Sequence, residues 1–322
     1  MLRVGISENI PASWLPEFPE SVQLIQLGYA SSEIHEIDFW IPPLYRKFAD
    51  PQYARLRGVK VIQSLLAGVD WMLPWVQSGM QPGVTLCDGQ GLHDVSVAEW
   101  VVGGILGAYK QFPEFRDQQR EEFWDGQLVG GKFPSDVEPP PYRILGEDMY
   151  GQTVLIVGYG GIGAAVEARL KPFGAEILRI ARTARPGIAA VSELSDMLPQ
   201  ADVVVLIVPL TAETRGLMNA AMFERMKPRA VLVNAARGPV VDTDALLVAL
   251  RANRIRAVLD VTDPEPLPKG HPLWSAPNCF LTPHVAGSTP GFFQRAYRFA
   301  AEQIQRYLTG EPLRNVVNPQ GY

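Results

Sequence analysis

A glycine-rich turn between an apolar run and a helical pattern constrains the fold of this chain more than any other feature. Val154–Val157 is a short run of Val, Leu and Ile residues, which is typical of a strand buried on both faces. Gly158, Gly160 and Gly163 follow it at the spacing G-x-G-x-x-G, and Ile162–Phe173 has the pattern of a helix. The stretch therefore predicts a strand, a tight turn and a helix in direct succession.

Each glycine of this turn has a separate physical role. Gly158 allows the tight turn, Gly160 leaves room for a pyrophosphate to approach the backbone, and Gly163 lets the helix lie close on the strand. The helix then offers the N–H groups and the dipole of its first turn to the phosphates. A glycine triplet alone is compatible with an ordinary turn, but a second predicted strand at Glu176–Ala181 favours dinucleotide binding.

Composition limits the classes of protein to which the chain can belong. Its 322 residues exceed one typical domain, so two are expected, and its 47% hydrophobic and 20% charged residues are those of a soluble globular protein. A net charge of −5 argues against nucleic acid or an anionic membrane as the main partner. The longest apolar run, Val203–Leu210, is far shorter than a membrane span.

The cysteines and the N-terminus favour the cytoplasm. Cys87 and Cys279 are too few for a disulfide framework, and their apolar, strand-like surroundings suit buried thiols in a reducing compartment. The N-terminal residues have the pattern of a first strand and contain no signal-peptide core.

Before the glycine-rich turn the chain alternates between strand patterns and weakly marked helices. A helix is expected around Tyr53–Leu56, and Ser96–Trp124 is expected to be one long helix, buried between two bodies, that crosses between domains. Gln127–Met149 is interpreted as an irregular arm, either a solvated loop or a subunit contact. The strands expected here are Leu2–Ser7, Val22–Leu27, Ile37–Ile41, Val59–Ser64 and Val84–Cys87.

After the turn, strands and helices alternate regularly, which predicts a parallel sheet covered on both faces. A last helix at Gly291–Leu308 is expected to return the chain to the first domain. The expected strands are Val203–Val208, Ala230–Asn234, Ala257–Val261 and Cys279–Thr282, and the expected helices are Ser192–Leu198, Met218–Arg225 and Thr243–Ala252.

Three polar residues follow the ends of three of these strands. Arg237, Glu265 and His284 should therefore meet at the edge where ligands of such sheets bind. Singly, they are compatible with a surface ion pair, a loop charge and a core imidazole. Their coincidence at one edge favours a catalytic group.

In their order and separations, seven motifs resemble the D-isomer-specific 2-hydroxyacid dehydrogenases over nearly the whole chain. This resemblance implies an α/β protein of two Rossmann-like domains, each a doubly wound parallel sheet, with the active site in the cleft between them. Residues 1–96 with 289–322 would bind substrate in a flavodoxin-like domain, and residues 97–288 would bind the dinucleotide. The motifs are Leu66–Asp70, Val97–Glu99, the glycine-rich turn, Pro209–Thr214, Asn234–Asp242, Leu259–Pro268 and Thr282–Gly287.

The resemblance also implies a role for individual residues. Arg237 would grip the carboxylate and carbonyl oxygen of the substrate, His284 would be the general acid/base, and Glu265 would hold and charge His284. Ala67 and Gly68 would donate N–H groups to the substrate carboxylate, although an ordinary turn is the local interpretation there. Substrate contacts are expected from Leu66, Ala67, Gly68, Arg237, Trp274 and His284.

Cofactor contacts are implied along the second domain, where Asp260 would meet the nicotinamide end. No metal site is expected, and the family implies a homodimer. The expected cofactor contacts are Gly158, Gly160, Gly161, Ile162, Gly163, Arg182, Thr183, Arg185, Pro209, Thr214, Ala235, Ala236, Asp260 and Gly287.

Elementary chemistry explains why these residue types are needed. Reduction of a 2-keto acid places a hydride on the carbonyl carbon and a proton on its oxygen, and histidine changes charge near neutral pH. A carboxylate on the other ring nitrogen favours the imidazolium. Arginine presents a planar fork to a planar keto-carboxylate and stabilises the developing alkoxide.

Departures from the family pattern bear on cofactor and substrate. NAD-using members end the second strand with an aspartate, whereas here Ala181 stands at that end and Arg182, Thr183 and Arg185 follow, which predicts NADP(H) as the preferred cofactor with NAD(H) still possible. Glu176 is discounted because it opens the strand. Leu66 and Trp100 replace a usual small residue and a common histidine, so the substrate side chain stays open.

The expected function is NADPH-dependent reduction of a small 2-keto acid. Glyoxylate and hydroxypyruvate lead because the Arg182–Thr183 pair and Pro272–Trp274 resemble that reductase branch. Oxidation of formate or phosphite, or a phosphoglycerate-type reaction, remains an alternative, although formate dehydrogenases carry glutamine in place of Glu265. A dinucleotide-sensing corepressor or scaffold is the alternative outside enzymes, and no appended recognition segment is evident.

Overall fold

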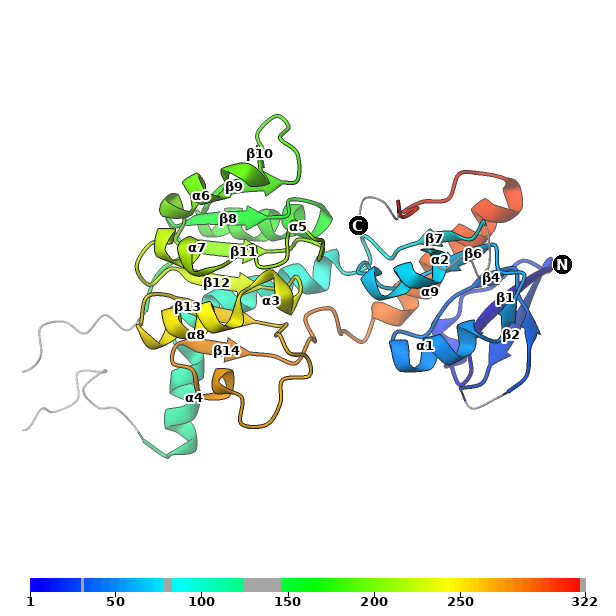
Figure 1. The fold of residues 1–322 in the computed structure, drawn as a ribbon, viewed down its shortest axis with the longest axis horizontal. Coiled ribbons are helices and arrows are strands. Elements are labelled where there is room, and N and C mark those ends of the chain that lie inside the picture. The colour runs from blue at the N-terminus through cyan, green and yellow to red at the C-terminus, as the bar shows by residue number, and fades with distance from the viewer. Residues whose placement is uncertain (30–31, 78–82, 124–145, 319–322) are drawn as a thin grey trace, which may run out of the picture. The chain divides into compact units, whose positions relative to one another are not determined.

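A computed structural model describes residues 1–29, 32–77, 83–123 and 146–318 (Figure 1). The chain divides into two compact units: unit 1 comprises Met1–Val95 and Gly287–Tyr322, and unit 2 comprises Ser96–Ala286. Each unit is built on a parallel sheet with helices, so the predicted α/β fold class is confirmed.

Unit 1 contains a five-stranded sheet in the order β2-β1-β4-β6-β7, and all its strands are parallel. This is the 2-1-3-4-5 order of flavodoxin-like sheets. A small separate sheet pairs β3 (His35–Glu36) with β5 (Leu56–Arg57). The main strands are β1 (Leu2–Ser7), β2 (Val22–Leu27), β4 (Phe39–Trp40), β6 (Val61–Gln63) and β7 (Thr85–Cys87).

Helices pack on both faces of this sheet because its strands are apolar on both sides. Val4 belongs to one apolar cluster with Ala300 of the C-terminal helix, and Ile62 belongs to another with Met72 and Trp75. The helical segments are α1 (Arg46–Tyr53), α2 (Leu73–Gln77) and α9 (Phe292–Thr309), with 3₁₀ turns η1 (Ala12–Trp14) and η2 (Asp70–Met72).

The helix expected around Tyr53–Leu56 is wrong. Helix α1 ends at Tyr53, and Leu56 begins the short strand β5. The apolar Tyr53 and Leu56 are both buried in the same cluster, so their spacing reflects a turn over the core and not a helical face.

Unit 2 contains a seven-stranded parallel sheet in the order β10-β9-β8-β11-β12-β13-β14, which can be followed in Figure 1. The order reverses at β8, as in dinucleotide-binding sheets of order 3-2-1-4-5-6. The strands are β8 (Thr153–Val157), β9 (Glu176–Ala181), β10 (Ala189–Ala190), β11 (Val203–Leu206), β12 (Val231–Asn234), β13 (Arg256–Leu259) and β14 (Cys279–Leu281).

Alternate residues of β8 pack into two different cores. Val154 and Ile156 belong to the cluster that contains α3 and α5, whereas Leu155 and Val157 belong to the cluster that contains α6, α7 and α8. A continuous apolar run is therefore required in this strand. The helices are α3 (Asp94–Tyr109), α4 (Phe112–Arg120), α5 (Gly161–Leu170), α6 (Leu194–Met197), α7 (Ala220–Arg225) and α8 (Thr243–Arg251).

Single-turn 3₁₀ segments extend or join several of these helices. The region expected to be the helix Ser192–Leu198 contains α6 between two of them. The 3₁₀ segments of unit 2 are η3 (Lys171–Phe173), η4 (Val191–Glu193), η5 (Leu198–Gln200), η6 (Gly238–Val240) and η7 (Pro272–Ser275).

The single long helix expected at Ser96–Trp124 is also wrong, because α3 and α4 are separate. Gln111 lies between them in the left-handed region, with φ of 53°, and Pro113 occupies the first turn of α4. Proline suits a helix start, but a continuous helix through Pro113 would lose the hydrogen bond to the carbonyl of Tyr109 and bring the proline ring against it, so α3 does not continue into α4. Most of the expected arm Gln127–Met149 lies outside the described residues.

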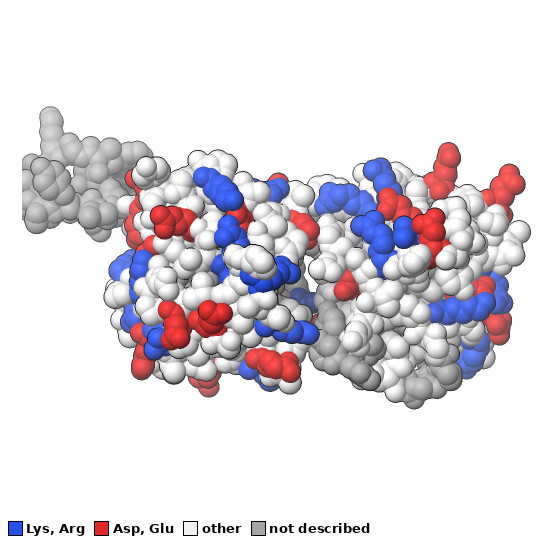
Figure 2. Space-filling view, turned by 90° about the horizontal axis from the view of Figure 1, so that it is seen from above, with Lys and Arg blue, Asp and Glu red and all other residues white. Residues whose placement is uncertain are grey.

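On the face shown in Figure 2, basic and acidic side chains are interspersed. Cys87 is buried in β7 and Cys279 is partly buried in β14, and both are free thiols. Among the described helices, none is both long and apolar enough to cross a membrane.

Candidate active site

The carboxyl ends of three neighbouring strands of unit 2 carry the polar residues expected to act together. In the parallel register, Asn234 of β12 lies beside Leu259 of β13, which lies beside Leu281 of β14. The turns that follow these residues therefore start from one edge of the sheet.

His284 and Glu265 form a direct pair at this edge. The Nδ1 atom of His284 lies 2.7 Å from Oε1 of Glu265, and the side chains keep 46% and 41% of their surface exposed. Burial raises the pKa of Glu265, but its hydrogen bond and charge interaction with His284, a backbone hydrogen bond at Thr262 and the charge of Arg237 outweigh it, so the pKa lies below its ordinary value. An accessible, charged carboxylate therefore holds one ring nitrogen of the imidazole.

The turn that carries Arg237 is fixed by its neighbours. The side chain of Asn234 donates from Nδ2 to the carbonyl of Arg237 at 3.1 Å and accepts the N–H of Ala236 at 3.0 Å. A β-carbon at Gly238 would collide with the carbonyl oxygen of Thr262, so glycine lets this turn approach the loop that leads to Glu265. Arg237 is thereby brought within electrostatic reach of Glu265.

The glycine-rich turn has the geometry that a phosphate cradle needs. Gly158 has φ of 103°, and a β-carbon there would meet the carbonyl of Ile207. A β-carbon at Gly160 would meet no atom within 4 Å, whereas one at Gly163 would lie 3.2 Å from Cγ2 of Ile156 in β8. The open side at Gly160 and the close contact at Gly163 fit a dinucleotide pyrophosphate beside the start of α5.

The N–H groups of Gly161 and Ile162 lie in the first turn of α5, where a helix has no acceptor of its own. Gly158 and Tyr159 instead donate their N–H groups to the carbonyl of Ile180, at 2.9 and 2.8 Å. The backbone of the turn is thus anchored to β9, while Gly160 and Gly161 at the start of α5 are exposed.

Comparison with known protein families identifies the family to which the chain belongs. Residues 102–286, more than half of the chain, match the family described as D-isomer specific 2-hydroxyacid dehydrogenase, NAD binding domain. The chain belongs to this family. It is therefore an oxidoreductase whose unit 2 is the nicotinamide-dinucleotide-binding domain.

Individual relatives of this dehydrogenase differ in reaction. A glyoxylate reductase from Thermofilum pendens is 34% identical over 270 residues, which cover 82% of this chain and 76% of that protein. A chloroplastic/mitochondrial formate dehydrogenase from Arabidopsis thaliana is 32% identical over 307 residues, covering 89% and 76%. A solved D-isomer specific 2-hydroxyacid dehydrogenase from Xanthobacter autotrophicus Py2, in complex with NADPH and MES, has a TM-score of 0.76 and 29% identity, covering 99% and 100%.

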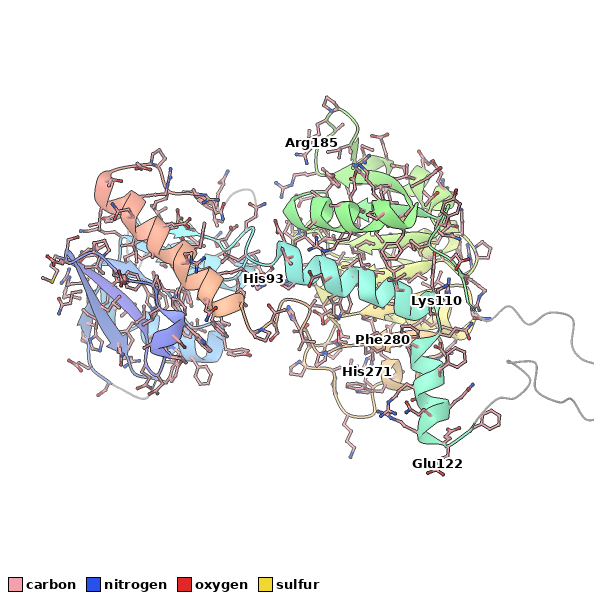
Figure 3. All side chains as sticks on the ribbon, turned by 180° about the vertical axis from the view of Figure 1, so that it is seen from behind. His93, Lys110, Glu122, Arg185, His271 and Phe280 are labelled. Carbon is pink, nitrogen blue, oxygen red and sulfur yellow. The ribbon has the colours of Figure 1, made fainter. Side chains whose placement is uncertain are left out.

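The residues expected to recognise the adenosine end of the cofactor lie beyond β9. This strand ends at Ala181, and Arg182, Thr183 and Arg185 are all exposed in the loop before β10. Figure 3 labels Arg185 in this loop. Nη2 of Arg185 donates to the carbonyl of Tyr159 in the glycine-rich turn at 2.8 Å. One of the expected 2′-phosphate ligands is therefore linked directly to the pyrophosphate turn.

A buried ionic cluster under the same turn was not predicted from the sequence. Glu167 of α5 accepts hydrogen bonds from Arg179 of β9 at 2.6 Å and from the hydroxyl of Tyr159 at 2.7 Å, and pairs with Lys171 at 2.7 Å. Hydrogen bonds from Arg179 lower the pKa of Glu167 to about 2, against the opposing effect of burial and with help from Lys171 and Tyr159. The sequence signal for it was a lone glutamate in an apolar helix face.

In unit 1, the turn expected to bind an anion is shaped by polar contacts with its neighbours. The N–H of Leu66 donates to Oγ of Ser64 at 3.0 Å. The carbonyl of Leu66 accepts the N–H of Gly89 at 2.8 Å. Ala67 and Gly68 remain the backbone donors that the family resemblance assigns to substrate.

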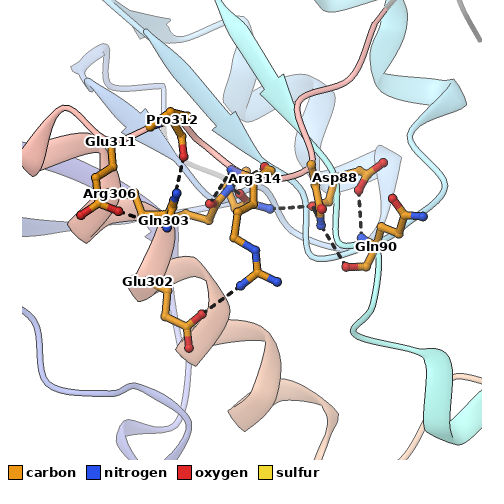
Figure 4. A network of polar contacts seen from close by, with 10 residues as sticks. Asp88, Gln90, Glu302, Gln303, Arg306, Glu311, Pro312 and Arg314 are labelled. Atoms are coloured by element: carbon orange, nitrogen blue, oxygen red, sulfur yellow. Dashed lines mark hydrogen bonds and ion pairs between the residues drawn. The ribbon is translucent and has the colours of Figure 1, made fainter. Parts of the chain in front are cut away.

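Buried amides hold the strand ends that lead to this turn. Nε2 of Gln63 donates to the carbonyls of Ser64 and Asp88, and Nε2 of Gln303 in α9 donates to Oε1 of Gln63 at 2.9 Å. Gln303 also bonds the backbone of Arg314 in both directions, within the network of Figure 4. The turn thus sits on a rigid base formed by β6, β7 and α9.

The remaining expected residues have varied surroundings. Thr214 donates its hydroxyl to the carbonyl of Pro209 at 2.6 Å, which closes the loop after β11. Trp274 is 57% exposed and donates its indole N–H to Pro268. Ala235 donates its N–H to Leu206, Ala236 is buried, and Gly287 belongs to unit 1, where a β-carbon would meet the ring of His93.

Proposed function

We propose that this dehydrogenase reduces a small 2-keto acid of the glyoxylate or hydroxypyruvate type to the D-2-hydroxy acid, with NADPH as the preferred reductant. The observation that carries the proposal is the 2.7 Å contact between Nδ1 of His284 and Oε1 of Glu265 at an exposed strand edge that also carries Arg237. This arrangement supports general acid catalysis on a carbonyl oxygen beside an anion-binding guanidinium.

In this proposal, His284, Glu265 and Arg237 each have a separate role in the reaction. Because Glu265 is bound to Nδ1, Nε2 of His284 is the ring nitrogen left to donate a proton to the carbonyl oxygen. The negative charge of Glu265 stabilises the imidazolium until that proton is transferred. Arg237 binds the carboxylate of the substrate and stabilises the negative charge that develops on the carbonyl oxygen. The reduced nicotinamide, when bound, supplies the hydride.

The preference for NADPH rests on the end of β9. No carboxylate stands at Ala181 to accept hydrogen bonds from a ribose 2′-hydroxyl or to repel a 2′-phosphate. Arg182, Thr183 and Arg185 supply two guanidinium groups and a hydroxyl in the following loop. The related Xanthobacter enzyme, solved with NADPH, supports this choice.

Oxidation of formate is the second candidate, because a formate dehydrogenase is among the relatives. A glutamine beside the histidine is the pattern that the family resemblance associates with that reaction, and this chain has Glu265. A carboxylate at this position favours imidazolium and hence the reductive direction.

We further propose that Ala67 and Gly68 of unit 1 donate N–H groups to the substrate carboxylate, that unit 1 is the substrate-binding domain, and that the enzyme is a cytoplasmic homodimer. The net charge of −5 and the interspersed charges on the face shown in Figure 2 support a small-molecule substrate over a nucleic acid. Mass photometry of the purified enzyme tests the dimer: a single species of monomer mass contradicts it.

The test is a panel of glyoxylate, hydroxypyruvate, pyruvate and phenylpyruvate, each with NADPH and NADH, alongside formate with NAD⁺ and NADP⁺. We expect the highest kcat/KM with glyoxylate or hydroxypyruvate and NADPH, and a D-configured product wherever the product is chiral. Turnover of formate alone would replace the proposal by the second candidate. Dinucleotide binding without turnover of any substrate would favour a sensing role.

A further inference from the structure

Asp260, directly after β13, is a buried carboxylate whose oxygens are used by the polypeptide itself. Its surface is only 3% exposed. Its Oδ1 accepts the hydroxyl of Thr282 at 2.6 Å and the N–H of Val285 at 2.8 Å, and its Oδ2 accepts the N–H of Ala286 at 2.9 Å. All three donors belong to the segment that carries His284.

The backbone of that segment adopts a conformation that needs such support. His284 has φ of 56°, in the left-handed region that only a few per cent of non-glycine residues adopt, most often asparagine, aspartate and histidine. Its N–H donates to the carbonyls of Asp260 at 2.7 Å and Thr282 at 3.1 Å. A residue held in this region persists because surrounding contacts determine it.

We propose that Asp260 is a positioning residue that fixes the turn Thr282–Ala286 and thereby holds Nδ1 of His284 against Glu265. The inference rests on the proposed function, because it assigns Asp260 to the same acid/base pair. Two further charged groups act on this pair: Arg237 through its charge on Glu265, and Asp260 through the turn. This role operates before any dinucleotide binds, in contrast to the expected contact with nicotinamide.

Two variants separate position from charge. Asp260→Asn replaces one of the two carboxylate oxygens by an NH₂ group. This NH₂ group then faces either the backbone N–H of Ala286 or the hydroxyl of Thr282, which had donated to the lost oxygen. Thr282→Val removes a single hydrogen bond and keeps the carboxylate charge. If position matters, both variants loosen the pair of His284 and Glu265; if only charge matters, Thr282→Val behaves as wild type.

The measurement is an NMR titration of the histidine rings in the dinucleotide-free protein, with the signal of His284 assigned by its absence in His284→Ala. We expect the titration of His284 to move to lower pH in both variants, further in Asp260→Asn, because a displaced imidazolium loses its carboxylate. We expect kcat of Asp260→Asn for 2-keto acid reduction to fall on the order of 10²-fold, as for small misplacements of catalytic groups. The Kd for NADPH should stay unchanged.

Asp202→Asn is the matched control. Its carboxylate also accepts a backbone N–H, from Thr153 at 2.9 Å, and pairs with Lys227 at 2.8 Å, but it lies where β8 and β11 begin, at the opposite edge of the same sheet. We expect the His284 titration of this variant to match that of the wild type.

The outcomes separate the alternatives. If the His284 titration is unchanged in both variants and the Kd for NADPH rises, the proposal is overturned and Asp260 is assigned to cofactor binding. If the titration is unchanged and only the Tm falls, the proposal is also overturned and Asp260 has a purely structural role. If Asp260→Asn does not fold, the titration of Thr282→Val decides. If the proposed function is wrong but Asp260 does position the turn, His284→Ala keeps the turnover of the wild type. Asp260→Asn still shifts the His284 titration in that case.

Discussion

Glu265 and Glu167 are two carboxylates of the same unit whose pKa values both lie below the ordinary range, yet their surroundings differ in kind. Glu265 is about two-fifths exposed and its direct partner is the titratable imidazole of His284. Glu167 is almost fully buried and its partners are the permanent cation Arg179, Lys171 and a phenol. A lowered pKa alone therefore does not distinguish a carboxylate of the proposed acid/base pair from a structural one.

The same contrast holds between two arginines on one strand. Arg179 points into the buried cluster and forms an ion pair with Glu167, whereas Arg182, three residues further along the chain, is exposed beyond the end of β9. We propose that Arg179 contributes to stability and that the exposed arginines beyond β9 bind the cofactor. The predictions below test this division, from the largest effect to the smallest.

Removing the imidazole should have the largest effect. His284→Ala should lower kcat for keto-acid reduction by roughly 10²–10⁴, the range of general acid–base catalysis. His271→Ala is the control, because this histidine caps the turn η7 by accepting the N–H of Leu273 (labelled in Figure 3). Steady-state kinetics measure kcat for both variants. A comparable loss of kcat in His271→Ala would contradict a specific catalytic role for His284.

The arginines beyond β9 come next. Charge-assisted hydrogen bonds contribute about 1.5–3 kcal/mol each, so Arg182→Ala with Arg185→Ala should weaken NADPH use by about 10²-fold or more. The kcat/KM with NADH should be nearly unchanged. Arg251→Ala, an exposed arginine on α8, serves as control. Equal kcat/KM for the two cofactors in the unmodified enzyme would refute the assignment.

The structural carboxylate should appear in stability and its pH dependence. The pKa of Glu167 falls from 4.5 to about 2, so it contributes up to about 3 kcal/mol of unfolding free energy, at 1.36 kcal/mol per unit. This contribution is present above pH 4.5 and is lost as the pH falls through 2. Glu167→Gln should therefore be less stable at neutral pH, and its deficit in urea unfolding should shrink in acid. A deficit independent of pH would point to packing instead.

Sequence reasoning succeeded where local pattern determines structure. The apolar runs of β8, β11 and β12 and the glycines at Gly158 and Gly163 determine a doubly wound sheet, because each requirement lies within one short stretch. The order of strands then brings His284 and Glu265 to one edge. The break between α3 and α4 was missed although Pro113 signalled it.

What failed or was missed depends on contacts between distant segments. The cluster of Glu167 joins a helix to the next strand, and only the packing of α5 on β9 places Arg179 against it. The contacts of Asp260 reach across more than twenty residues to Thr282 and Ala286. Spacing in the sequence carries no signal for such pairs because it does not specify which side chains face one another.

The most direct test of the account is the pH profile of keto-acid reduction by Glu265→Gln. The neutral amide no longer favours the imidazolium of His284, so activity that depends on the protonated ring should be lost at lower pH than in the wild type. In Glu167→Gln the profile should keep its position, because that carboxylate does not contact His284. A lower-pH profile in Glu265→Gln alone is the predicted result, and an unchanged profile in that variant would contradict the central claim.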